Sequence, residues 1–291
     1  MRIADCGLRN DAKPFFLLIL ILFCVPLLVY AETMQPEIVF EPKKVGPGDI
    51  MIVTLKNVKG PVEGAFRGKK LYFNPIKNNY EAVVGIDLYL EPGQYDLAIK
   101  SNGVALNRSV LVSKKKYPLQ RLTLPKGMVE LSPENEARVE LEQKKTASLW
   151  PVDSLRVWNG KFINPLPGKK IGTKFGVRRL INKIPKNSHS GVDVTAEEGE
   201  PVLAPNDGVA VLVEEQFYSG NSVILDHGQG IYTMFFHLSK ANVRVGQAVL
   251  KGEVIGFVGS TGRASGAHLH WGVRMQGARV DPLELIQLKL E

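Results

Sequence analysis

Cysteine is almost absent from this chain of 291 residues, and histidine occurs only from residue 189 onward. The two cysteines, Cys6 and Cys24, both lie within the first 31 residues. A mature chain that begins after residue 31 has no thiol, which excludes a cysteine nucleophile and a structural disulfide. Metal or proton-transfer chemistry is therefore left to the five histidines, which are His189, His227, His237, His268 and His270.

The N-terminal residues have the three regions of a secretory signal. Basic residues precede an apolar run over residues 15–30, and the small residue Ala31 ends the segment. The run is shorter than the roughly 20 residues that a membrane-spanning helix needs, and Pro26 interrupts it. The sequence predicts a signal peptide over residues 1–31 that is cleaved after Ala31. Retention of this segment as a membrane anchor is the alternative.

The composition is that of an ordinary globular protein, with 44% hydrophobic and 23% charged residues. The length favours two domains with accessory segments. The net charge of +8 suits an anionic partner such as nucleic acid, an acidic membrane surface or a cell-wall polymer, and charge alone does not choose among them. The secretory signal argues against nucleic acid as the partner.

Residues 32–117 are predicted to form an antiparallel β-sandwich of the immunoglobulin-like kind. Residues 50–55 are rich in strand-forming side chains, and Tyr95, Leu97 and Ile99 alternate with more polar neighbours. Such segments recur at roughly 8 to 12 residues, which is typical of a small sandwich. Histidine, cysteine and acidic clusters at ligand spacing are missing here. A structural or positioning module is expected, with a wall-binding or inhibitory role as the alternative.

Residues 118–157 are predicted to be a linker that contains one helix. Ser132 and Pro133 form a helix start, because a hydroxyl caps the first turn and proline suits the first helical position. Glutamates follow in the first turn, and Lys144 and Lys145 lie toward the end, where each charge complements the helix dipole. Pro151 closes the segment. The linker separates the sandwich from a second domain over residues 158–291.

The second domain is rich in β-strands and glycine. Residues 226–230 are expected to form a turn, and residues 245–256 alternate turns with short strands. Neither an internal repeat nor a low-complexity tract is found. The predicted strands are residues 202–204, 209–213, 222–225 and 231–238.

The histidines of this domain lie in patterns that suit a metal site. His268 and His270 are separated by one residue on an expected strand, so both side chains point to the same face. His189 precedes Asp193 by four residues, and the intervening glycine allows a turn that brings the two together. Catalytic zinc takes three protein ligands and leaves a fourth position for water. Two histidines and one aspartate satisfy that number. With the isolated His237 the constellation has four histidines, so two remain for proton transfer or charge stabilisation.

These residues resemble the M23 family of zinc metallopeptidases, the lysostaphin-type peptidoglycan endopeptidases. The resemblance runs from about residue 162 to residue 285 and matches the family in order and spacing. Its motifs are Phe175-Gly176-Val177-Arg178, His189-Ser190-Gly191-Val192-Asp193, Ala204-Pro205-Asn206-Asp207-Gly208, Phe236-His237-Leu238-Ser239, Gly246-Gln247 and Gly259-Ser260-Thr261-Gly262, followed by His268-Leu269-His270.

The resemblance implies the fold and the site. The fold is a lysostaphin-type antiparallel β-sheet, the duplicated hybrid motif, and the whole chain is mainly β. His189, Asp193 and His270 are the implied ligands of one zinc ion per chain, and His237 and His268 are the implied catalytic pair. His227 is expected to be a turn residue. Phe235 stands where many members carry tyrosine, which removes a hydroxyl from the neighbourhood of His237.

The resemblance also implies a function. The chain is expected to be a secreted zinc endopeptidase that uses metal-activated water to hydrolyse peptide cross-links of bacterial peptidoglycan. Its partners are then the peptidoglycan stem peptides, with a membrane only if the signal segment is retained, and its location is the periplasm, the cell envelope or the exterior. The alternative is a catalytically silent wall-binding regulator of another cell-wall hydrolase. A lipoyl- or biotinyl-type module is disfavoured, because no lysine stands at a hairpin tip between hydrophobic residues.

Overall fold

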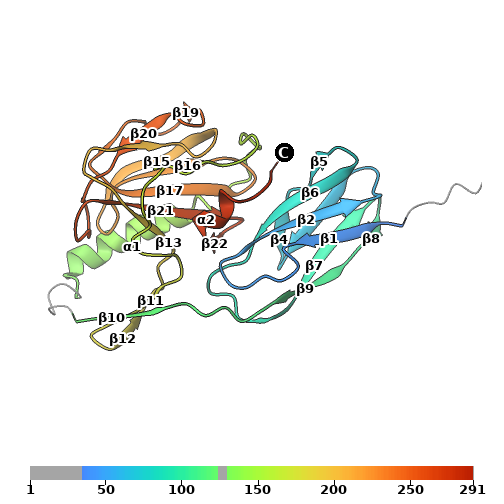
Figure 1. The fold of residues 1–291 in the computed structure, drawn as a ribbon, viewed down its shortest axis with the longest axis horizontal. Coiled ribbons are helices and arrows are strands. Elements are labelled where there is room, and N and C mark those ends of the chain that lie inside the picture. Colours follow the sequence, from blue (N-terminus) through green and yellow to red (C-terminus); the bar gives the residue numbers. More distant parts are fainter. Residues whose placement is uncertain (1–34, 124–129, 291) are drawn as a thin grey trace, which may run out of the picture. The chain divides into compact units, whose positions relative to one another are not determined.

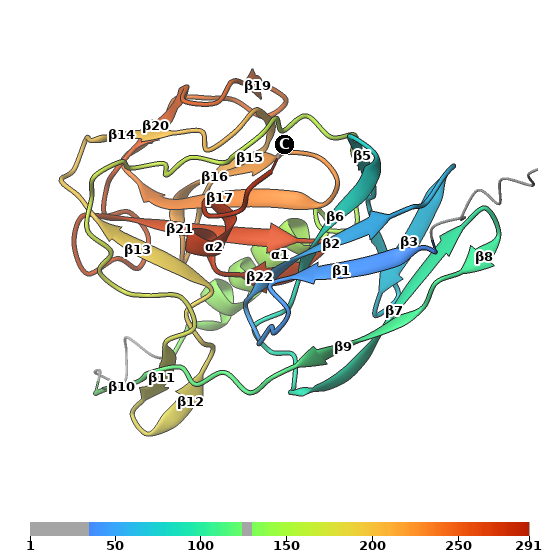
Figure 2. The ribbon, with the colours of Figure 1, turned by 45° about the vertical axis from the view of Figure 1, so that its right-hand side comes forward.

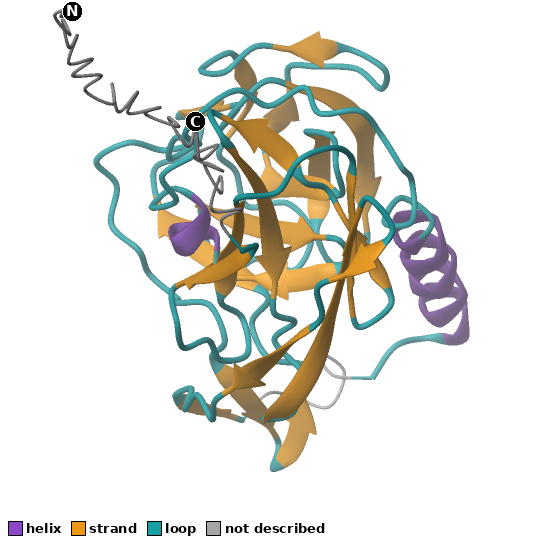
Figure 3. Cartoon of the chain, turned by 90° about the vertical axis from the view of Figure 1, so that its right-hand side faces the viewer, coloured by secondary structure: helices purple, strands orange, loops and turns teal. Residues whose placement is uncertain are grey.

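The computed structural model describes residues 35–123 and 130–290. The predicted signal peptide, its cleavage point and both cysteines lie outside the described residues. Residues from Gln35 onward belong to one compact unit, in which strands far outnumber helices (Figure 3). Neither helix of the described residues is long and apolar enough to cross a membrane.

The N-terminal residues form two antiparallel sheets that pack into a sandwich. Leu97 and Ile99 are buried while their neighbours on the same strand are exposed, as the alternation in the sequence predicts. They share a core with Val53 and Leu55 of the other sheet, so the two sheets face each other. The first sheet has the order β1 (Glu37–Glu41), β2 (Ile50–Lys56), β6 (Asn79–Gly85), β5 (Asn74–Ile76). The second contains β4 (Lys69–Leu71), β3 (Val62–Phe66), β7 (Gly93–Ser101) and β8 (Val104–Ala105), with β9 (Arg108–Val112) also paired to β7.

The linker holds the predicted helix and a strand that the sequence analysis missed. Helix α1 (Pro133–Ala147) begins after Ser132, whose side chain accepts a hydrogen bond from the backbone of Asn135. Strand β10 (Leu119–Leu122) pairs in parallel with β11 (Arg178–Ile181) of the second domain. Together with β12 (Ile184–Lys186) they form a small sheet (Figure 2). The linker therefore contributes a strand to a sheet of the second domain.

The second domain is organised around a seven-stranded sheet (Figure 1). Trp271, Phe235 and Leu225 are fully buried on it and belong to one large core. Every pair of named strands in the sheet is antiparallel, as the family resemblance implies. The order is β13 (Gly191–Thr195), β21 (His268–Met275), β17 (Ile231–Leu238), β16 (Gly220–Asp226), β15 (Gly208–Gln216), β19 (Ala248–Val249), with β22 (Ala278–Val280) beside β21. A smaller sheet has the order β14 (Pro201–Leu203), β20 (Val254–Phe257), β18 (Lys240–Ala241), and helix α2 (Pro282–Leu285) follows β22.

The sandwich and the second domain share contacts. The backbone N–H of Ile50 donates to the Glu284 carboxylate at 2.8 Å, and the N–H of Leu88 donates to the Arg279 carbonyl at 3.1 Å. Ile50, Leu88 and Val83 of the sandwich are buried in the same apolar cluster as the core of the second domain. The two modules therefore stabilise each other by apolar burial as well as by hydrogen bonds.

Candidate active site

Strand pairing brings the site residues together. Asp193 on β13 lies opposite His270 on β21, and His270 lies opposite Phe236 on β17. Facing residues on neighbouring strands have side chains about 5 Å apart, so these three strands deliver their side chains to one place. His268, two residues before His270, points to the same face, and its Nε2 is 3.8 Å from Asp193 Oδ1.

His189 reaches this place from the loop before β13. Its backbone N–H donates to the Val177 carbonyl at 2.9 Å, and its carbonyl accepts from the Gly176 N–H at 2.8 Å. The motif around Phe175, which is buried in the core, thus runs beside the His189 loop and fixes its backbone. The His189 side chain is only 4% exposed.

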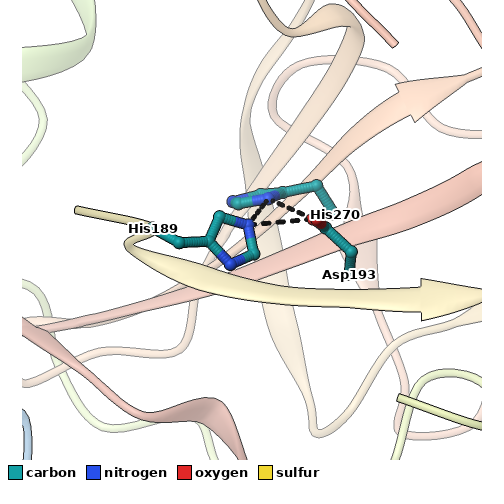
Figure 4. A group of neighbouring side chains, drawn as sticks. All are labelled: His189, Asp193 and His270. Carbon is teal, nitrogen blue, oxygen red and sulfur yellow. Dashed lines mark hydrogen bonds and ion pairs between the residues drawn. The ribbon is translucent and has the colours of Figure 1, made fainter. Parts of the chain in front are cut away.

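His189, Asp193 and His270 converge on a single point (Figure 4). Asp193 Oδ1 lies 2.9 Å from His189 Nε2 and 2.9 Å from His270 Nδ1, and the two nitrogens are 3.0 Å apart. The three atoms therefore form a nearly equilateral triangle. This is the set of side chains in the described residues that can hold a metal ion.

The hydrogen bonds at the triangle favour a cation at its centre. His189 Nδ1 lies 2.9 Å from the Lys174 carbonyl, and a carbonyl oxygen only accepts, so Nδ1 carries the proton and Nε2 presents a lone pair. A single proton on His270 Nδ1 lies between at most two of the three atoms, so it cannot account for all three short contacts. A cation attracts all three of them at once.

The donor set also fits zinc in type and spacing. Zinc is bound by histidine nitrogen and carboxylate oxygen, and ligands at about 2.0–2.1 Å from a tetrahedral centre are about 3.3 Å apart. The observed sides of 2.9 to 3.0 Å need to open by only a few tenths of an ångström. The Lys174 carbonyl supplies the outer-shell acceptor that fixes the His189 ring, as is usual for metal-bound histidines.

The charge states suit metal binding at neutral pH. Burial alone would raise the pKa of Asp193, but the contacts with His189 and His270 outweigh it and hold that pKa well below its ordinary value. Burial lowers the pKa of His270 to about 4, and the Asp193 carboxylate offsets this only in part. At neutral pH the aspartate is ionised and His270 is neutral, the forms in which both act as ligands.

His237 and His268 form a second pair beside the triangle. Their ring centres are 4.8 Å apart, and the ring of His237 is 6.3 Å from that of His270. His237 Nδ1 donates to the Thr261 carbonyl at 2.9 Å, and His268 Nδ1 donates to the Gly266 carbonyl at 2.8 Å. In the neutral form of each ring, the Nε2 atom therefore presents a lone pair. Burial lowers the pKa of His237 below its ordinary value, although the hydrogen bond to the Thr261 carbonyl acts in the opposite direction.

A β-bulge aims His237 into the site. Asn221 pairs with Leu238 and Val223 pairs with Phe235, so both Phe236 and His237 lie opposite the single residue between them on β16. His237 has a φ of 63°, a left-handed conformation that L residues rarely adopt. The bulge breaks the usual alternation, so two successive side chains, His237 and Phe236, both reach the site. Phe236 stacks on His270, with 5.4 Å between ring centres.

Two further residues shape the site. Gly191 is required because a Cβ added there would lie 2.6 Å from His270 Nε2 and 2.4 Å from the Trp271 carbonyl. The motif with a glycine between His189 and Asp193 carried this signal. Phe235 is fully buried in the core. The ring that contacts His270 is that of Phe236, which lies opposite it on β17.

His227 lies elsewhere, as the sequence predicts. It is fully buried, and its Nδ1 donates to the Asp207 carbonyl at 2.7 Å while Nε2 accepts from the Thr233 hydroxyl at 2.7 Å. Burial lowers its pKa to about 4. The ring also packs edge-on against Phe162. His227 is a neutral core residue with both nitrogens satisfied.

The family of the protein follows from this site and from its relatives. The model of peptidase family M23 matches residues 187–282, which contain all the residues of the triangle and the second histidine pair. The crystal structure of a putative M23 peptidase from Pseudomonas aeruginosa is similar with a TM-score of 0.69 and 30% identity, over 83% of this chain and 94% of that chain. The chain belongs to peptidase family M23, a family of metallopeptidases.

Curated relatives match a shorter region. The DD-carboxypeptidase/endopeptidase Mpg of Neisseria meningitidis serogroup B is 40% identical over 123 residues, which cover 42% of this chain and 28% of that protein. The peptidoglycan DD-endopeptidase ShyA of Vibrio cholerae is 38% identical over 117 residues, 40% of this chain and 27% of that protein. The chain thus matches little more than a quarter of the length of these relatives.

Proposed function

We propose that the mature chain is a secreted zinc endopeptidase that hydrolyses peptide cross-links of bacterial peptidoglycan. The observation that carries the proposal is the convergence of two histidines and one aspartate on a point beside two further histidines whose Nδ1 atoms are hydrogen-bonded to backbone carbonyls. The relatives named DD-endopeptidase support the choice of peptidoglycan over other peptides. This reaction would take place in the periplasm, in the cell envelope or outside the cell, in agreement with the predicted signal peptide.

In this proposal His189, Asp193 and His270 hold one zinc ion per chain. When bound there, zinc polarises the scissile carbonyl and lowers the pKa of water from 15.7 toward about 7. His237 and His268 lie beside these ligands, with the His237 ring next to His270 and the His268 ring next to Asp193. The other residues of the site then act on the proton and on the developing charge.

His237 and His268 are proposed to move the proton and stabilise the oxyanion. As water adds to the carbonyl carbon, one of its protons passes to a free Nε2 lone pair. The same nitrogen returns the proton to the leaving amine when the C–N bond breaks. The second imidazole, close to the first at 4.8 Å between ring centres, stabilises the charge on the carbonyl oxygen. Their hydrogen bonds to the Thr261 and Gly266 carbonyls keep both rings in the tautomer that this reaction needs.

We also propose the domain organisation predicted from the sequence. It comprises a signal peptide over residues 1–31, a sandwich over 32–117, a linker over 118–157 and a metallopeptidase domain over 158–291. The pairing of β10 with β11 and the apolar contacts of Ile50 and Leu88 support a sandwich that is fastened to the metallopeptidase domain. A module held in this way is better suited to a positioning or covering role than to the role of a flexible tether.

The test uses the mature chain, residues 32–291, and purified sacculi. We expect about one zinc ion per chain and the release of cross-link cleavage products, with release abolished by a chelator and restored by zinc. The muropeptides released identify the bond that is cut. A zinc-containing protein that binds sacculi and releases nothing from several wall types would overturn the proposal and favour a wall-binding regulator.

A further inference from the structure

Helix α1 of the linker lies against one end of the β15–β16 hairpin. Arg138 donates to the Glu215 carboxylate at 2.9 Å, and Lys145 forms an ion pair with Glu214. Thr146 accepts a hydrogen bond from the Gln216 side chain at 3.1 Å. Val139 is the buried residue of the helix, and these polar contacts hold the helix against the hairpin.

Glu142 makes the most specific of the helix contacts. Its two carboxylate oxygens accept the backbone N–H of Phe217 at 2.9 and 3.1 Å, and one of them also accepts from Arg138 Nε at 2.7 Å. Phe217 is the first residue after β15 and begins the turn to β16. Hydrogen bonds to an ionised carboxylate are stronger than neutral ones, and the Glu142 side chain is only 18% exposed. The linker helix thus holds the hairpin turn by its backbone.

The same turn holds His237. The Ser219 carbonyl accepts the backbone N–H of His237 at 2.7 Å. On the other side, the Thr261 hydroxyl accepts the N–H of Asn221 at 2.9 Å, and the Thr261 carbonyl accepts the His237 ring proton. The contact between turn and loop is close, since a Cβ added to Gly220 would lie 2.3 Å from Thr261. Both the backbone and the ring of His237 therefore depend on where the turn lies.

We propose that Glu142 is a positioning residue for His237, acting through the turn that begins at Phe217. The proposal rests on the proposed function, because it assigns His237 to the reaction. His237 is in the left-handed region at a β-bulge, a conformation that persists only where the surrounding structure holds it. Loss of the Glu142 contacts frees the turn, and the Nε2 atom of His237 moves away from the reacting atoms while the zinc ligands stay in place.

The test compares Glu142→Ala with Glu140→Ala in the mature chain. Glu140 lies on the same helix and pairs with Lys144 at an exposed position, so it controls for loss of a helical carboxylate. With soluble cross-linked muropeptide dimers as substrate, we expect Glu142→Ala to lower kcat by about tenfold or more, because displacements of about 1 Å cost up to about 10²-fold. KM and zinc content should be unchanged, and Glu140→Ala should match the wild type.

Glu142→Gln provides the rescue. Its amide oxygen still accepts the Phe217 N–H, so we expect it to recover most of the lost kcat. A Glu142→Ala protein with the kcat of Glu140→Ala overturns the inference, and so does a loss of kcat that is accompanied by an equal loss of zinc. A wild-type protein that cleaves no dimer refutes the proposed function itself, which separates that failure from the failure of this inference.

Discussion

Replacing His237 with alanine is expected to lower kcat by about 10²- to 10³-fold, the usual cost of removing one group that stabilises charge in the transition state. The zinc content should remain at about one ion per chain. The reason lies in the geometry, since the His237 ring lies beside His270 of the triangle and its Nδ1 donates to the Thr261 carbonyl. His268→Ala is expected to behave in the same way, because its Nδ1 is committed to Gly266.

The measurement pairs cleavage of muropeptide dimers with zinc analysis of the same preparation. His270→Ala is the matched comparison, because it removes an imidazole from the same strand as His268 but should lose zinc. Equal zinc loss in the His237, His268 and His270 variants would refute the division between metal ligands and catalytic histidines. Full activity in the His237 variant would refute its part in the reaction.

Asp193→Ala is expected to lose both zinc and activity. Asp193 Oδ1 is one corner of the triangle and is the only anion in it, so its removal leaves two imidazoles without a carboxylate to bind a divalent cation. Loss of an outer-shell partner already costs about 10- to 100-fold in metal affinity, and we expect loss of a direct ligand to cost more than about 100-fold.

Competition with a chromogenic zinc chelator measures that affinity. Asp96→Ala is the control, because Asp96 is an exposed carboxylate on β7 of the sandwich. Its affinity for zinc should equal that of the wild type. An Asp193→Ala protein that keeps wild-type affinity for zinc would remove the carboxylate from the ligand set.

The triangle could be anticipated from the sequence because short motifs carry it. His268 and His270 share a face through strand alternation alone, and His189 and Asp193 flank a glycine turn. What brings these two motifs together is the pairing of β13 with β21, 77 residues apart between Asp193 and His270. In the sequence, only the resemblance to a family links these two motifs.

The way in which His237 enters the site could not be anticipated. A regular strand would point Phe235 and His237 to the same face. The bulge opposite β16 changes this relation: Phe235 is in the core, while the successive side chains of Phe236 and His237 both reach the site. Bulges depend on the register between two strands, which residue periodicity does not contain.

The contacts of the linker could not be predicted from the sequence either. Ser132, Pro133 and the charged turns of α1 identified the helix correctly, since caps and charge preferences are local. The partners of that helix are not local, because Glu142 meets Phe217 across 75 residues. Strand β10 was missed for the same reason, because its pairing with β11 depends on chain segments that are distant in sequence.

The central claim is that His189, Asp193 and His270 bind the zinc ion. Anomalous X-ray diffraction at the zinc absorption edge, from crystals of the mature protein loaded with one equivalent of zinc, tests it most directly. We predict a single peak within bonding distance of His189 Nε2, Asp193 Oδ1 and His270 Nδ1. A peak bound by other side chains, or no peak in a protein that cleaves peptidoglycan, would contradict the account.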